Sequence, residues 1–250
     1  MAITSLTLSY TWLQSSTPPH RLRACCYSST QLSVHKTLTH VHSSGVIACL
    51  RANSAELALK AALSGGISVL EIVMSTPGVF EVLQQLVQEH PTTTLGVGTV
   101  LNVEDAKNAI NAGAKFLMSP AMVKDIMVDA QCGEVLYIPG VMTPTEILSA
   151  CDSGAKIVKV YPVSALGGSR YISALKRPFH HISMVASQGI TIDSVREYIT
   201  QEASAVVLSD AIFDKEAISQ NKFNEICRLA HFAALQGNEE LEWKKRCTLN

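Results

Sequence analysis

The chain lacks several features that mark common classes of protein. Its 20 Lys and Arg are balanced by 21 Asp and Glu, so it has no excess of basic charge for binding nucleic acid or a membrane surface. No apolar run approaches the roughly 18 residues that a membrane-spanning helix needs. The 7 cysteines are scattered and odd in number, and no two are spaced as C-x-x-C. This pattern favours free thiols in a reducing compartment over a disulfide framework.

The first part of the chain lacks acidic residues altogether. The first Asp or Glu is Glu56, and residues 1–30 are rich in Ser and Thr, with Arg21 and Arg23 as their only Lys or Arg. A Ser-rich, Arg-bearing and acid-free leader is typical of an organelle transit peptide. Because hydroxyl residues far outnumber arginines, we expect a chloroplast destination rather than a mitochondrion or the cytoplasm. A disordered cytoplasmic tail is the alternative, and the folded domain is expected over residues 31–250.

From residue 31 onward, short β-rich runs alternate with segments that carry helix signals. The runs are apolar throughout, which is typical of a parallel sheet covered by helices. The intervals between them leave room for one helix and two loops each. The predicted strands are Val46–Arg51, Val69–Met74, Thr94–Val100, Phe116–Pro120, Leu136–Val141, Ile157–Tyr161, Ile182–Ala186 and Ala205–Ser209.

The helix signals are N-cap residues, early prolines and terminal glycines. Asn102 and Thr143 are predicted N-caps, and Pro144 suits the first helical position after Thr143. Strand and helix units in this number predict a closed (β/α)₈ TIM barrel, with an open doubly wound sheet as the alternative. Helices are predicted over residues 55–64, 78–90, 103–113, 144–154 and 192–200, with a leading helix over 31–44 that plugs the barrel bottom and a largely helical end over 214–245.

Two charged residues interrupt the apolar strands. Lys159 lies in the run IVKVYP and Glu71 in the run VLEIVMS. Lysine is rarely buried without cause, and burial disfavours its ammonium form, which makes the free amine a nucleophile. Glu71, facing the same interior, could move protons beside it. The alternatives are a buried Lys–Glu pair without catalysis, or a wrong strand assignment that leaves Lys159 exposed.

Other polar residues give weaker signals. His40 and His42 could bind a metal, but no acidic residue lies near them in the sequence, so we expect them to face solvent. The cysteines are expected to be small core residues.

The motifs GGISVLEIVMST, GVGTVLN, AGAKFLMSP, YIPGVMTPTE, IVKVYPVSALGG and QGIT closely resemble those of the KDPG/KHG aldolase family. These are class I aldolases that split 2-keto-3-deoxy-6-phosphogluconate (KDPG) or 4-hydroxy-2-oxoglutarate (KHG). The resemblance covers about residues 31–235 and is that of a plant, plastid-targeted member. It implies a homotrimer that needs no cofactor and no metal.

The resemblance also assigns roles. Lys159 matches the family's Schiff-base lysine and Glu71 its general acid/base. Thr99 matches a hydroxyl near the keto-acid end of the substrate, and Pro120 matches a Ser-Pro turn at the pyruvate pocket. Tyr161 stands where the family usually has Phe, beside the imine.

The sequence departs from the family around the far end of the substrate. Ser75 stands where the family commonly has an Arg that grips a carboxylate. After the seventh strand the family reads T-G-G, but this chain has Ser187-Gln188-Gly189, of which Ser187 and Gly189 are kept as substrate-binding candidates. After the eighth strand it reads G-G-S, but this chain has Ser209-Asp210-Ala211.

Three hypotheses follow from these departures. The first is a KDPG-type aldolase that binds its substrate's phosphate by other groups, with Arg51 as a candidate charge. The second is a lyase for a smaller, unphosphorylated 2-keto acid, including decarboxylation of oxaloacetate. The third is an inactive barrel that serves as a binding protein.

Overall fold

The computed structural model describes residues 21–51, 55–131 and 133–248, and its centre is a parallel β-sheet. The sheet order is β5-β4-β3-β2-β1-β9-β8-β7-β6, and every pairing is parallel. The strands are β1 (Val46–Leu50), β2 (Val69–Val73), β3 (Thr94–Gly98), β4 (Phe116–Met118), β5 (Leu136–Ile138), β6 (Gly140–Val141), β7 (Ile157–Val160), β8 (Ser183–Ser187) and β9 (Ala205–Leu208).

The sheet closes on itself at Pro139. β5 and β6 stand at the two ends of the strand order, yet only this residue separates them in the chain. Proline has no N–H to give to a strand ladder. Its carbonyl still accepts a hydrogen bond from the Lys159 N–H at 2.8 Å, which joins the two edges. The predicted strand Leu136–Val141 is therefore one barrel strand in two pieces, the closed barrel is confirmed, and the open sheet is excluded.

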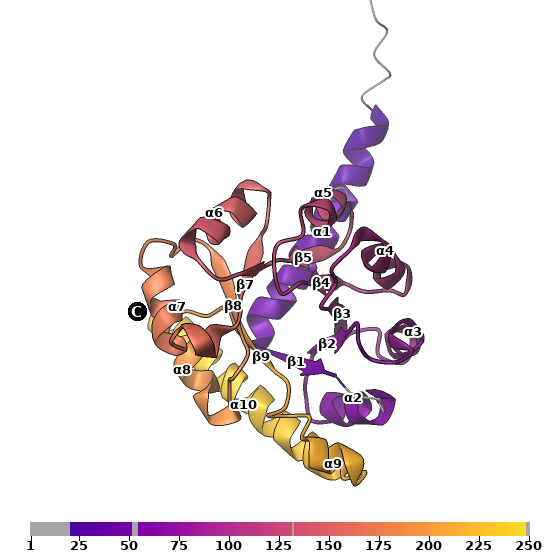
Figure 1. Ribbon diagram of the computed structural model, residues 1–250, viewed down its shortest axis with the longest axis vertical. Coiled ribbons are helices and arrows are strands. Elements are labelled where there is room, and N and C mark those ends of the chain that lie inside the picture. Colours follow the sequence, from indigo (N-terminus) through magenta and orange to yellow (C-terminus); the bar gives the residue numbers. More distant parts are fainter. Residues whose placement is uncertain (1–20, 52–54, 132, 249–250) are drawn as a thin grey trace, which may run out of the picture.

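Helices surround the strands as a ring, and α1 (Arg21–Ser44) crosses one end of the barrel (Figure 1). α10 runs alongside α2 and α8 on the outside. The other elements are α2 (Ala55–Ser64), α3 (Val79–Glu89), α4 (Val103–Asn111), α5 (Lys124–Gln131), α6 (Pro144–Asp152), η1 (Val163–Leu166), α7 (Ser169–Lys176), η2 (Ile192–Ser194), α8 (Val195–Thr200), α9 (Lys215–Ser219) and α10 (Phe223–Thr248).

The predicted caps are present where the structure describes them. The Asn102 side chain accepts the Asp105 N–H at 2.8 Å, and Thr143 forms a reciprocal capping box with Glu146. Thr191 caps the short η2 turn that precedes α8.

Alternation of side chains along the strands divides the core into two layers. One layer packs between the strands and the surrounding helices. The other fills the barrel, where Val34 and Leu38 of α1 pack against its bottom, so the predicted plug is confirmed. The buried apolar members of this interior layer are Val41, Ile47, Cys49, Val69, Val73, Phe116, Met118, Leu136, Ile138, Ile157, Val185, Ala205 and Val207.

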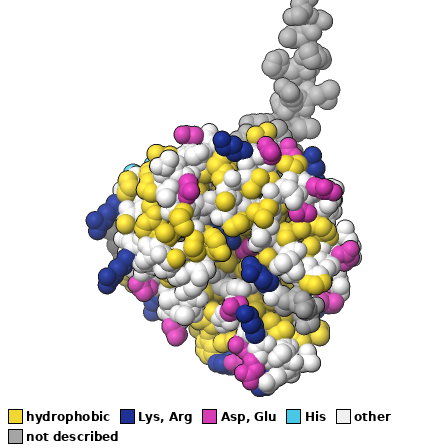
Figure 2. Space-filling view, in the orientation of Figure 1, with side chains coloured by type: hydrophobic (Ala, Val, Ile, Leu, Met, Phe, Trp, Pro, Cys, Tyr) yellow, Lys and Arg dark blue, Asp and Glu magenta, His cyan; other side chains and the backbone are white. Residues whose placement is uncertain are grey.

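The expected boundary at residue 30 falls inside α1, which is helical from Arg21. Residues 1–20 lie outside the described residues, so the transit peptide stays a prediction. In the described part of the chain, no helix combines the length and apolarity that crossing a membrane requires. On the face shown in Figure 2, Lys and Arg side chains are scattered among carboxylates and form no basic patch.

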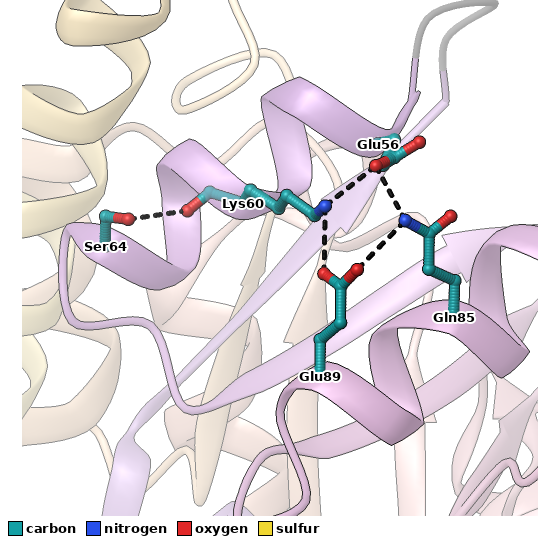
Figure 3. A network of polar contacts seen from close by, with 5 residues as sticks. All are labelled: Glu56, Lys60, Ser64, Gln85 and Glu89. Atoms are coloured by element: carbon teal, nitrogen blue, oxygen red, sulfur yellow. Dashed lines mark hydrogen bonds and ion pairs between the residues drawn. The ribbon is translucent and has the colours of Figure 1, made fainter.

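A polar network ties α2 to α3 on the outside of the barrel (Figure 3). The Lys60 ammonium contacts Glu56 at 2.7 Å and Glu89 at 2.8 Å, and the Gln85 amide donates to both carboxylates. Hydrogen bonding from Lys60 lowers the pKa of Glu56 and of Glu89 below the ordinary 4.5. Because the two pKa values are lowered in the folded state, their contribution to stability is present at neutral pH and is lost as the pH falls through and below 4.5.

We expect Lys60→Met to lower the melting temperature slightly at neutral pH and low salt. The loss should shrink in high salt, because these side chains are partly exposed and screened. It should vanish well below pH 4.5, where both carboxylates are protonated. Calorimetry of wild type and variant checks this. The control is Lys107→Met, which removes a 3.6 Å pair with Asp129 and should change nothing measurable. A Lys60 effect that is independent of pH would contradict the account.

Candidate active site

Lys159 and Glu71 meet inside the barrel. Lys159 lies on β7, Glu71 lies on β2, and both point to the interior. The Lys159 Nζ is 3.8 Å from Glu71 Oε1, and the side chains are 8% and 1% exposed. The strand assignment that would have exposed Lys159 is therefore excluded. Each charge lies in an apolar interior with the other as its nearest opposite charge, which makes their joint burial tolerable.

Gly98 makes room for the Glu71 side chain. A Cβ placed on Gly98 would lie 1.6 Å from Glu71 Oε1, so the carboxylate occupies the space of the missing side chain. The other oxygen, Oε2, is buried without a hydrogen-bond partner. A buried, unpaired carboxylate oxygen is costly and is kept where it has a function. The second glycine of the run GVGTVLN therefore allows the Glu71 carboxylate to lie against the backbone of β3.

Cys49 is a neighbour of Glu71 that the sequence did not single out. It is the register partner of Glu71 across β1 and β2, and its buried thiol lies close enough to the carboxylate to feel its charge. Burial, and then the charge of Glu71, raises the pKa of the Cys49 thiol well above its usual value. The thiol therefore stays protonated and can donate to Glu71. Only its place at an inward position of the first strand could have drawn attention to it.

Thr99 and Pro120 follow adjacent strands, β3 and β4, and are fixed by one buried residue, Ser119. The Ser119 hydroxyl donates to the Val100 carbonyl at 2.6 Å and accepts the Tyr137 hydroxyl at 2.9 Å. Thr99 itself has a φ of 60°, a conformation that β-branched residues rarely adopt. Strain of this kind at the mouth of a barrel is typical of functional positions.

Tyr161 and Pro120 line a cavity of about 510 Å³ at the carboxyl ends of the strands. Gly140 also lines it and is the register partner of Lys159. The Lys159 Nζ lies 5.5 Å from the centre of the Tyr161 ring. A larger cavity, of about 690 Å³, lies between α8 and α10 and is lined by helical residues only. The smaller cavity shares Tyr161 with the surroundings of the Lys159 amine, although neither Lys159 nor Glu71 lines it.

The remaining candidates surround the same mouth. Arg51 is exposed directly after β1, and it acts electrostatically on Cys49. Ser187 is buried at the end of β8, and Gly189 is exposed with a φ of 70°. Ser75 is exposed in the turn after β2.

The two histidines of α1 correct one expectation. His40 Nδ1 lies 2.6 Å from the Thr94 hydroxyl, and His42 Nε2 is a buried atom, so these side chains are partly buried rather than solvent-facing. Burial lowers the pKa of both imidazoles. Among the described residues, no group of His, Cys, Asp and Glu could hold a metal ion.

This arrangement suits amine chemistry on a carbonyl compound. A lysine amine can add to a ketone, and a carboxylate at 3.8 Å can transfer the protons that addition and dehydration require. The neighbouring cavity has room for a small substrate.

Known proteins resemble the chain over most of its length. The profile of the KDPG and KHG aldolase family matches residues 34–229. A 2-dehydro-3-deoxy-phosphogluconate aldolase of Treponema pallidum is 29% identical over 199 residues, covering 80% of this chain and 95% of the relative. A KHG/KDPG aldolase of Escherichia coli K12 is 28% identical over 174 residues, covering 70% and 82%.

Solved structures agree with the sequence relatives. A KDPG aldolase from Legionella pneumophila, captured with pyruvate as a covalent carbinolamine intermediate, superposes with a TM-score of 0.72 at 27% identity. The match covers 78% of this chain and 96% of that one. The chain belongs to the KDPG and KHG aldolase family.

Proposed function

We propose that this protein is a class I aldolase that cleaves 2-keto-3-deoxy or 4-hydroxy-2-keto acids to pyruvate and an aldehyde. The observation that carries the proposal is the buried Lys159 amine, 3.8 Å from the Glu71 carboxylate. Family membership and the covalent pyruvate intermediate of the Legionella relative support it. For KDPG the aldehyde would be glyceraldehyde 3-phosphate, and for 4-hydroxy-2-oxoglutarate it would be glyoxylate.

The reaction begins with attack of the Lys159 amine on the 2-keto carbon. Glu71 supplies and removes the protons as the carbinolamine loses water and an iminium forms. Glu71 then takes the proton of the C4 hydroxyl, directly or through a water molecule. The C3–C4 bond breaks, the aldehyde leaves, and the bonding electrons neutralise the iminium as an enamine. Protonation at C3 and addition of water release pyruvate and restore the Lys159 amine.

The residues around this centre would position the substrate. The Thr99 hydroxyl and the turn at Pro120 are placed to hold the keto-acid end, and Tyr161 packs beside the imine. Arg51 is an exposed cation at the mouth and could attract the substrate's carboxylate. Ser187 and Gly189 would contact the departing aldehyde.

A second candidate is decarboxylation of a small 2-keto acid such as oxaloacetate. It uses the same iminium and enamine, and the loss of carbon dioxide replaces the loss of an aldehyde. It needs no phosphate site, and the loops after β8 and β9, where barrels commonly bind phosphate, carry the exposed carboxylates of Asp193 and Asp210.

Borohydride reduction in the presence of pyruvate tests the proposal. We expect one covalent adduct, located on Lys159 by peptide mass spectrometry, and we expect it to be absent from Lys159→Met. Lys176 serves as an internal control, because it is also buried but its amine donates to the Ile182 carbonyl at 2.8 Å. If no adduct formed on Lys159, the aldolase proposal would be wrong, and the protein would be the inactive barrel of the third hypothesis.

Gly98→Ala tests the role of Glu71 without altering either charged residue. The new methyl would displace the Glu71 carboxylate, because its place is 1.6 Å from Oε1. We expect kcat for pyruvate-forming cleavage to fall by about 100-fold or more, the size of a general acid–base contribution. The control is Gly133→Ala, whose methyl would meet its nearest atoms at 3.6 Å or more. Normal kcat in a folded Gly98→Ala protein would rule out Glu71 as the acid/base.

We propose further that the protein is a homotrimer, as its resemblance to the family implies. Exposed apolar side chains on two outer helices support an interface there: Val128 on α5 and Leu148 on α6. Light scattering should give three times the mass of one chain. Val128→Glu should lower it, whereas a monomeric wild type would contradict the assignment.

We also propose that the protein works in the chloroplast stroma. The support is the acid-free, hydroxyl-rich composition of residues 1–30. Expression of these residues fused to a fluorescent protein distinguishes chloroplast from mitochondrion and cytoplasm.

A further inference from the structure

Gln188 adopts a backbone conformation that glycine takes more easily. It follows β8 and has a φ of 88°, and its neighbour Gly189 has a φ of 70°. A glycine at 188 would hold this turn without strain, whereas a side chain there has a conformational cost. We therefore expect the contacts of the glutamine side chain to account for the presence of a residue other than glycine at this position.

The Gln188 side chain joins two loops across the mouth of the barrel. The Ser164 hydroxyl, on η1, donates to Gln188 Oε1. η1 follows the strand that carries Lys159. A Cβ placed on Gly189 would lie 2.5 Å from Ser164, so the loops after β7 and β8 are already in close contact. Gln188 therefore fills space at the outer end of the site.

The position of Gln188 matches the far end of a bound substrate. Lys159 pairs in register with Val185, so Gln188 lies three residues further toward the mouth. At a rise of roughly 3.3 Å per residue, this is about 10 Å beyond the Lys159 backbone along the strand direction. The carbon chain of a six-carbon sugar acid, bound at C2, extends toward this level with its terminal group.

The loops after β8 and β9 offer little to a phosphate. These are the seventh and eighth barrel strands, whose loops commonly bind phosphate through backbone N–H groups and a short helix. Here the Ala217 N–H at the start of α9 is taken by the Asp214 carboxylate at 2.8 Å. The Thr191 N–H is taken by the Ser194 hydroxyl at 3.0 Å. The Ser209 carbonyl accepts the Ile212 and Phe213 N–H groups at 3.0 and 2.8 Å.

The charge at these loops is unfavourable as well. Asp193 and Asp210 are exposed in the loops after β8 and β9, where each carboxylate would repel a terminal phosphate more strongly than a terminal carboxylate, because the phosphate carries the larger negative charge. Residues 188–194 and 209–214, both fully described, contain no Lys, Arg or His; of the cations that follow them directly in the chain, Arg196 is paired with Glu239, and Lys215 is the first residue of α9.

We propose that the substrate of this aldolase is a short 2-keto acid without a phosphate group, and that Gln188 is a residue that sets this limit. The inference rests on the proposed function and narrows its substrate class. The bridge between Ser164 and Gln188 joins the loop after β7 to the loop after β8, one of those where barrels commonly bind a terminal phosphate, and Asp193 and Asp210 repel its charge.

Steady-state cleavage rates on defined substrates test this inference. We expect kcat/KM for the better of 4-hydroxy-2-oxoglutarate and oxaloacetate to exceed that for KDPG by about tenfold or more. Gln188→Gly should lower the ratio of kcat/KM for the unphosphorylated substrate to kcat/KM for KDPG by about tenfold, because it opens the turn and relieves its strain. Ser164→Ala removes the hydrogen bond and should shift the ratio in the same direction by less.

Asn221→Gly is the matched control. Asn221 also has a positive φ, 54°, but lies between α9 and α10, so glycine there relieves strain away from the site and should leave the ratio unchanged. A wild type that prefers KDPG, or a Gln188→Gly ratio equal to that of wild type, would overturn the inference. If either of these results is found but pyruvate still forms an adduct on Lys159, the protein is an aldolase and only the proposed substrate class is wrong. If no adduct forms, both fail together.

Discussion

The contact between Lys159 and Glu71 sets conditions that the rest of the barrel has to meet. A lysine and a glutamate side chain are tolerated in an apolar interior because they lie close to each other, since a charge on either one alone would be buried without a partner. They come from strands on different sides of the barrel, so their contact depends on closure of the sheet at Pro139. It also depends on a glycine at 98, since any larger residue would occupy the place of the carboxylate.

Much of this could be predicted from local sequence pattern. The apolar runs identified the strands, and Lys159 and Glu71 stood out because a charge within such a run is rare. The inward direction of both side chains followed from alternation along a strand. The caps at Asn102 and Thr143 depend on neighbouring residues only and were predicted correctly.

Features that depend on distant parts of the chain could not be predicted. Contact of Ser164 with Gln188, and of Cys49 with Glu71, requires knowing which strands are neighbours and at what register. The partial burial of His40 depends on Thr94, a residue on β3. The helical conformation of residues 21–30 was not expected from their Ser-rich composition, because serine is a modest helix former.

The helix that plugs the barrel has a consequence for the order in which the protein can form. Val41 of α1 packs among interior side chains that reach as far along the chain as Val207 of β9. This helix lies near the start of the described chain, and the strand that completes its surroundings lies near the end. Contacts between such distant segments are slow to form. The apolar side of α1 therefore stays exposed until the last strands have folded, and its burial is a late step in formation of the barrel.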